Sequence, residues 1–307
     1  MKRLLFVLAN GFILFFYSEP LFWSRPRPED TLLDWCWTWL AYSLLAFVFL
    51  TAVWYFRVNS LPALFIAGGL FGWLAEGVIV QTMYDNFPWQ LSWTGLAWHA
   101  LISVLFGWHY LPRAFRNGQT ARTALIAALA GLAWGFWAVN WWVEEPARVA
   151  APLEFGLYAL AFVSCLVGAY WLREKLAAHA AMPRWTIGTI LALFALYFVF
   201  VAVPAQPLAL IVFPPALLLV LLTLRRHRQG APESSLLDQP ERGELLQVLP
   251  VLLMPLAAVA VYSLFYFLDW RIQSNWVVAL VTTPAGAIAF TWSVVAIWRR
   301  KIPEKIN

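Results

Sequence analysis

About ten hydrophobic runs, each long enough to cross the hydrocarbon core of a membrane, occupy most of the chain. A helix needs about 20 apolar residues for one crossing, and these runs are about 18 to 24 residues long. Inside a bilayer the backbone must satisfy its own hydrogen bonds, so such runs fold as helices. They are residues 4–23, 36–56, 61–84, 91–111, 123–142, 152–172, 185–203, 207–224, 246–268 and 276–298. The sequence therefore predicts an all-α integral membrane protein, a bundle of about ten transmembrane helices.

Basic residues predict how these helices are oriented. With the N-terminus in the cytoplasm, all 21 Lys and Arg residues fall on the cytoplasmic side except Arg25, Arg27, Arg148 and Arg271. Such an excess is typical of multi-pass proteins, and a miscounted helix would invert every later loop. We therefore expect both termini in the cytoplasm and a multi-pass protein of a bacterial-type inner or plasma membrane. The first run lacks a small-x-small cleavage site, so we expect it to remain as a helix.

Composition argues against other classes of protein. Hydrophobic residues make up 62% of the 307 positions and charged residues 12%, whereas soluble domains are about half apolar and a quarter charged. The net charge of +5 comes from basic residues at the ends of the runs. The chain has no Lys/Arg-rich arm of the kind that would suggest a nucleic-acid partner. We expect one polytopic membrane domain over 1–307, with the bilayer as its partner. Residues 225–245, which are polar and bear Pro and Gly, are predicted to form a mobile cytoplasmic loop between helices eight and nine.

Two ionisable residues lie inside neighbouring runs. Glu76 is eight residues from the outer end of the third run, and His99 is eight residues from the outer end of the fourth. At 1.5 Å per residue both would lie about 12 Å below the outer boundary. A short loop joins these helices, so they are expected to be antiparallel neighbours and Glu76 is expected to contact His99.

The helix faces around this pair are rich in small residues. Glu76 shares its face with Gly72 and Gly69, and His99 shares its face with Ser92 and Ser103, among others. Small faces permit close helix packing. An intramembrane ionisable residue indicates a functional site, so we predict an acid/base or proton-coupling pair. A polar clamp between two helices is the structural alternative.

A second group of candidates is predicted near the outer boundary. Asn140 and Glu144 lie four residues apart on the fifth helix, and Trp141 belongs to a set of tryptophans gathered at this level. An acidic, aromatic vestibule would suit a cationic or sugar-bearing ligand. With Ser92 and Ser103, these three are our candidate substrate-binding residues. An ordinary aromatic belt at the membrane interface is the alternative interpretation.

No motif indicates a metal site or a cofactor, because the chain has no His-Glu-x-x-His helix, phosphate loop or haem-type histidine pair. Three functional hypotheses remain. The first is a transporter or binding protein for a small molecule, with an outward-facing polar cavity around Glu76 and His99. The second is a membrane-embedded enzyme acting on a lipid or lipid-linked substrate from the outer leaflet. The third is a non-catalytic assembly subunit. The sequence does not decide whether the protein is an enzyme.

Overall fold

The computed structural model describes every residue except 26, 28, 177–182, 239–243 and 301–307. The described residues form helices and short connections, with no strand. The helices and helical turns are α1 (Lys2–Ser18), α2 (Pro20–Trp23), α3 (Leu32–Tyr55), α4 (Leu61–Leu74), η1 (Ala75–Ile79), η2 (Thr82–Tyr84), α5 (Trp89–Ser92), η3 (Trp93–Tyr110), α6 (Leu111–Arg116), α7 (Thr120–Ala138), α8 (Trp141–Glu144), η4 (Pro146–Arg148), α9 (Pro152–Leu176), α10 (Arg184–Tyr197), η6 (Phe198–Ala202), α11 (Val203–Ala205), α12 (Ala209–Gln229), α13 (Leu245–Val248), η7 (Leu249–Leu252), α14 (Leu253–Phe267) and α15 (Ser274–Arg299).

Nine helical stretches in the described part of the chain are long and apolar enough to span a membrane, with mean hydropathies of 1.5 to 2.4. They coincide with nine of the predicted runs, which confirms a helical membrane bundle. The other predicted run, 91–111, lies within the continuous helix of α5, η3 and α6, which is not among the nine. His99 and His109 lower the hydropathy of this helix. Ten crossings and cytoplasmic termini stay predictions.

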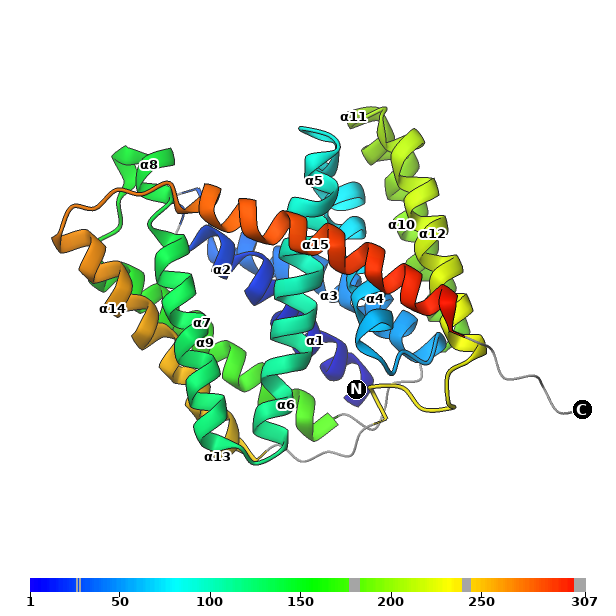
Figure 1. Ribbon diagram of the computed structural model, residues 1–307, viewed down its shortest axis with the longest axis horizontal. Coiled ribbons are helices and arrows are strands. Elements are labelled where there is room, and N and C mark those ends of the chain that lie inside the picture. Colours follow the sequence, from blue (N-terminus) through cyan, green and yellow to red (C-terminus); the bar gives the residue numbers. More distant parts are fainter. Residues whose placement is uncertain (26, 28, 177–182, 239–243, 301–307) are drawn as a thin grey trace, which may run out of the picture.

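The short segments gather at the two ends of the bundle (Figure 1). The view places α5, α8 and α11 at its upper end, and α6, α13 and the N-terminus at its lower end. We call these the upper and lower ends of the molecule. Consecutive spans are thus connected alternately at the upper and the lower end, as expected when each span runs antiparallel to the one before it.

The centre of the bundle is built around α1 and α4. In the most apolar stretch of the span formed by α4 and η1, 89% of the residues are buried inside the protein. In the corresponding stretch of the span that starts with α10, only 6% are buried. α4 packs against η3 and α15, and α1 packs against α3, α9 and η3. Polar groups on α4, η1, η3 and the end of α1 therefore lie inside the protein, where lipid does not reach them.

The connection after α12 begins later than predicted. The helix continues to Gln229, because the apolar pattern is followed by residues that still favour a helix. The described part of the connection then contacts the link between α3 and α4. The Leu236 amide donates to the Val58 carbonyl at 2.8 Å, and Arg57 lies 3.6 Å from Glu233. The mobility of residues 225–245 stays a prediction.

Candidate functional site

Glu76 and His99 form the predicted contact. The distance between Glu76 Oε1 and His99 Nε2 is 2.7 Å. The side chains are 11% and 3% exposed, so Glu76 is the more accessible member of the pair. The contact forms because each of the two helices has its ionisable side chain on the face of small residues that packs against the other helix.

Glycines allow this close approach. A Cβ atom added at Gly72 would lie 2.0 Å from the Gly95 carbonyl oxygen and 2.8 Å from the His99 Cβ. A Cβ atom at Gly68 would lie 3.0 Å from the Ala100 Cα. Gly69, which the sequence placed on the same face, lies against Leu96 of η3 and also against Phe290 of α15. The backbones of α4 and η3 can therefore be this close only with glycine at position 72.

Both members of the pair lie in π-helical segments, Glu76 in the five-residue η1 and His99 in the 18-residue η3. A π-helix carries an extra residue in each hydrogen-bonded ring, and single π-helical turns, such as η1, are frequent at functional sites. The helix of Glu76 ends at Ile79, not at Tyr84 as predicted. The reason is Gln81, whose backbone is left-handed (φ 60°) and whose side-chain amide donates to the carbonyls of Val78 and Ile79. Glu76 therefore lies about one turn from its helix end, closer to the upper end than predicted.

The pair belongs to a longer chain of hydrogen bonds. The Thr82 hydroxyl donates to Glu76 Oε2. On the other side of the imidazole, His99 Nδ1 lies 3.0 Å from Ser18 Oγ at the end of α1. Ser18 Oγ in turn lies 3.0 Å from Ser103 Oγ, one turn below His99. Four helical segments thus contribute to one continuous polar path, which runs from Thr82 to Ser103.

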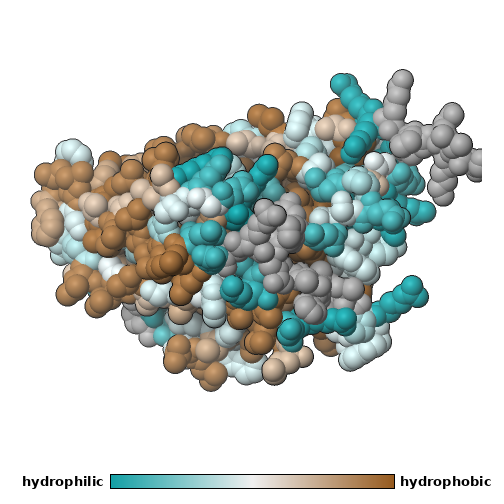
Figure 2. All heavy atoms as spheres, turned by 90° about the horizontal axis from the view of Figure 1, so that it is seen from below, coloured by the Kyte–Doolittle hydropathy of each residue, from teal (hydrophilic) through white to brown (hydrophobic). Residues whose placement is uncertain are grey.

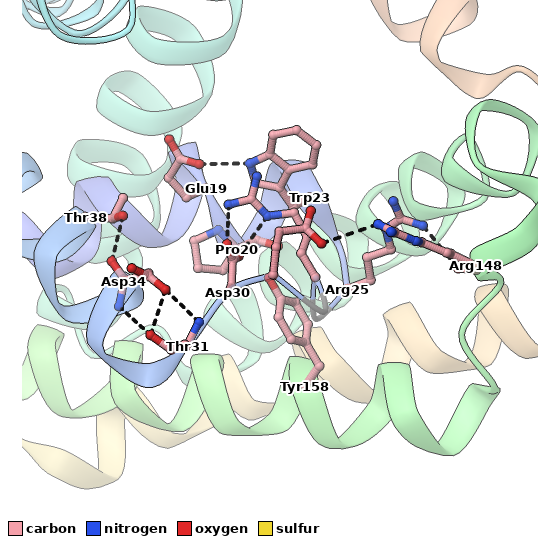
Figure 3. Close-up of polar contacts among 12 residues, drawn as sticks. Glu19, Pro20, Trp23, Arg25, Asp30, Thr31, Asp34, Thr38, Arg148 and Tyr158 are labelled. Atoms are coloured by element: carbon pink, nitrogen blue, oxygen red, sulfur yellow. Dashed lines mark hydrogen bonds and ion pairs between the residues drawn. The ribbon is translucent and has the colours of Figure 1, made fainter.

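A second carboxylate lies beside this path. The Tyr42 hydroxyl donates to Glu19 Oε1 at 2.9 Å. The Trp23 indole donates to Glu19 Oε2 at 2.9 Å, as Figure 3 shows. Glu19 directly follows Ser18, and the Tyr42 ring lies 6.4 Å from the His99 ring between centroids. The upper half therefore holds a second carboxylate, which is linked through Tyr42 to the surroundings of the imidazole.

The predicted substrate-binding residues divide into two groups. Ser103 lies on the polar path. Ser92 donates to the Thr283 carbonyl of α15 at 2.6 Å, and Glu144 accepts from the Asn275 amide at 2.7 Å. Asn140 is 1% exposed, and its Oδ1 has no hydrogen-bond partner among the described residues. Trp141 packs on Trp23 in a stacked arrangement, with the ring centroids 4.9 Å apart. Their roles in binding stay predictions.

The tryptophans near the upper end pack against one another. Trp98 lies 4.8 Å from Trp137 and 4.8 Å from Phe22 between ring centroids, and both tryptophans are less than one-tenth exposed. The indole of Trp98 also donates to the Tyr17 carbonyl at 3.0 Å. These rings fill protein interior, so part of the predicted aromatic rim is packed core.

The acidic side chains of the upper end are partly neutralised. Arg25 forms a 2.6 Å ion pair with Glu145. It also donates to the Arg148 carbonyl, and Figure 3 shows these two arginines side by side. Arg148 lies 3.3 Å from Glu29. Both arginines thus pair with carboxylates of this end, and the surface is less negative than its acidic residues alone suggest.

Metal ligation finds no support in the described residues. No group of three His, Cys, Asp or Glu side chains there is placed to hold a metal ion. Cys36 and Cys165 are free and exposed.

The sequence did not reveal Ser18, Glu19, Tyr42 or Thr82 as members of the site. Ser18 and Glu19 lie near the end of the first run, where polar residues are ordinary. Their proximity to His99 depends on how α1 packs against η3, which no local pattern encodes. The available signal was weak: a Ser-Glu-Pro sequence that ends a hydrophobic helix.

Comparisons of the chain with protein-family models, with curated proteins and with solved structures found no match.

Proposed function

We propose that the protein is a multi-pass membrane transporter in which the Glu76–His99 pair takes up and releases a proton from the upper side. The observation that carries the proposal is the buried chain of hydrogen bonds from Thr82 through Glu76 and His99 to Ser18. Ionisable groups inside a membrane bundle are costly, and they mark proton relays and ion pathways. Of the pair, Glu76 is the more accessible, and the half-buried Thr82 extends the path toward the upper end.

The imidazole allows the path to conduct a proton. A neutral imidazole donates from one ring nitrogen and accepts at the other. In the tautomer with hydrogen on Nδ1, a proton that arrives at Glu76 passes to the unprotonated Nε2 of His99, and the resulting imidazolium donates its Nδ1–H to Ser18 Oγ. Protonation changes the charge between the two helices, which gives the transporter two states with different packing energies.

The wider context of the proposal follows from charge and hydrophobicity. The lower end is the cytoplasmic side, because most Lys and Arg residues fall in its connections. The membrane is a bacterial-type plasma membrane, and the transported ligand is a small molecule that enters an outward-facing polar cavity beside the pair. Asn140, whose buried amide oxygen has no partner in the part of the chain that the structure describes, is a candidate contact for that ligand.

Proton-dependent charge displacement tests this function without knowledge of the substrate. Proteoliposomes adsorbed on a solid-supported membrane receive a jump from about pH 8 to about pH 6, the range in which histidine titrates. The expected result is a transient current in the wild type that Glu76→Gln abolishes. Glu154→Gln is the matched control, because Glu154 is an exposed carboxylate at the start of α9. A current of equal size in Glu76→Gln would overturn the proposal.

A second candidate function is favoured by the order of Ser18, His99 and Glu76. A hydroxyl, an imidazole and a carboxylate in sequence form the arrangement of a nucleophile, its base and the group that orients the base. Ser18 Oγ would attack the carbonyl carbon of a lipid ester while His99 Nδ1 takes the hydroxyl proton and delivers it to the leaving alcohol. This enzyme would react covalently with a fluorophosphonate at Ser18, and Ser18→Ala would abolish the labelling. Absence of labelling in the wild type would exclude it.

A further inference from the structure

A basic cavity lies at the lower end of the molecule, between the start of α4 and α6. It has a volume of about 380 Å³, and its polar lining comes from Asn59, Ser60, His109, Arg113, Arg116 and Asn117. Figure 2 looks onto this end, where hydrophilic side chains gather over the middle and right of the view. The cavity is far along η3 from the Glu76–His99 pair, since His109 comes ten residues after His99.

Positive charge dominates this cavity. Arg116 is paired with Glu174 at 2.5 Å, and buried Arg173 lies 4.0 Å from the same carboxylate. Arg113 is exposed and has no side-chain partner among the described residues. Of the two arginines that line the cavity, Arg116 is therefore neutralised by Glu174, whereas the charge of Arg113 has no counter-charge among the described residues.

Unused hydrogen-bond donors point to an anion. Asn59 Nδ2 is buried and has no partner among the described residues. Ser60 is the N-cap of the 14-residue helix α4, but its side chain makes no capping bond. The free amides and the dipole of a helix N-terminus favour a negative group. The guanidinium of Arg113, the amide of Asn59 and the start of α4 thus form one set of donors without an acceptor.

An apolar groove continues from this cavity along η3. The groove has a volume of about 270 Å³ and shares Leu61 and His109 with the basic cavity. It also shares Ile102 and Phe106 with a third, apolar cavity of about 420 Å³, which extends to Trp98. The three spaces therefore adjoin one another in a run beside η3, basic at the lower end and apolar above it. At 1.1 to 1.5 Å per residue, roughly, the distance from His109 to Trp98 approaches the thickness of one leaflet, about 15 Å.

We propose that this run binds an anionic phospholipid of the lower leaflet. The phosphate group lies in the basic cavity against Arg113, Asn59 and the start of α4, and one acyl chain lies in the groove along η3. Free phosphate offers the same headgroup chemistry, but the adjoining apolar groove favours the lipid. The site is separate from the Glu76–His99 pair, and binding does not depend on proton exchange there.

Thermal unfolding of the purified, delipidated protein in detergent tests the proposal. The probes are dioleoylphosphatidylglycerol, dioleoylphosphatidylcholine and inorganic phosphate. A ligand that binds only the folded state raises Tm with its concentration. We expect phosphatidylglycerol to raise Tm more than phosphatidylcholine does, and inorganic phosphate to have no effect. An equal shift with inorganic phosphate, or no shift with any probe, would overturn the lipid site.

Two pairs of variants locate the binding. Arg113→Ala should weaken phosphatidylglycerol binding at least about tenfold, because it removes a charge-assisted bond to phosphate. Arg184→Ala is its control, since Arg184 is exposed at the start of α10 and lines none of the three cavities. Leu105→Trp should block the groove, whereas Leu129→Trp, at a lipid-exposed position of α7, should not. Unchanged affinity in both Arg113→Ala and Leu105→Trp would contradict the proposal.

Discussion

The Glu76 carboxylate keeps its place because both of its oxygens have hydrogen-bond partners, His99 Nε2 and the Thr82 hydroxyl. His99 is held in the same way, with Glu76 on one ring nitrogen and Ser18 on the other. A buried charge that loses its partner destabilises a protein by about 3 to 5 kcal/mol, whereas a well-packed apolar pair often costs little. The contribution of the pair to packing and its proposed proton exchange can therefore be separated by substitution.

His99→Ala should lower the free energy of unfolding by about 3 to 5 kcal/mol, because it leaves Glu76 without its main partner. The double variant Glu76→Leu/His99→Leu should recover most of this stability while the proton-dependent current stays absent. Thermal unfolding in detergent and the pH-jump current measure the two effects. A double variant that keeps both stability and current would show that the pair is only a clamp between helices.

At the scale of elements, the site depends on how closely α4 approaches η3. Gly72 faces the Gly95 carbonyl, and Gly95 itself lies under the Trp73 ring, 2.6 Å from where its Cβ would be. Each helix thus has a glycine where the other helix comes closest: Gly72 faces the backbone of η3, and Gly95 faces the Trp73 ring of α4. The π-helical segments η1 and η3 then turn Glu76 and His99 toward each other.

Gly72→Ala should therefore separate the two helices and break the pair. Overpacking usually costs about 1 to 3 kcal/mol, and here the obstacle is a backbone carbonyl that cannot rotate away. We expect a lower Tm and loss of the proton-dependent current. Gly168→Ala in α9 is the matched control, because nothing lies within 4 Å of the Cβ it would add. Equal Tm values for the two variants would contradict the packing described here.

Local patterns predict the helices of this protein better than their ends and their partners. The length of the hydrophobic runs identified the nine apolar spans. Glu76 and His99 lie the same number of residues from the outer ends of two neighbouring runs, and this placed them opposite each other. The end at Ile79 was missed because it depends on the Gln81 side chain, and Gln81 looks like any polar residue near a helix end. Ser18 was missed because it reaches His99 only through the packing of α1 on η3.

The whole molecule presents polar groups of different kinds at its two ends. The upper end carries the paired carboxylates and the polar path from Thr82 to Ser103, and the lower end carries the basic cavity. If the lower end is cytoplasmic, the two native cysteines lie in different environments. Cys36 is exposed in the second turn of α3, near the upper boundary, whereas Cys165 is exposed halfway along α9, where lipid surrounds it.

A membrane-impermeant maleimide added to intact cells should therefore label Cys36 and not Cys165. Labelling should disappear in Cys36→Ser and persist in Cys165→Ser, as gel shifts with a heavy maleimide would show. If Cys36 reacts only after the cells are opened, the upper end faces the cytoplasm and the orientation is wrong.

The central claim is that the Glu76–His99 pair exchanges its proton with the upper, outward-facing side. The most direct measurement applies the pH-jump to right-side-out and to inside-out membrane vesicles, with Cys36 labelling as the check of orientation. Because Glu76 is the more exposed member of the pair and Thr82 leads from it toward the upper end, we predict a Glu76-dependent current only in right-side-out vesicles. A Glu76-dependent current only in inside-out vesicles, or no such current in either preparation, would contradict the claim.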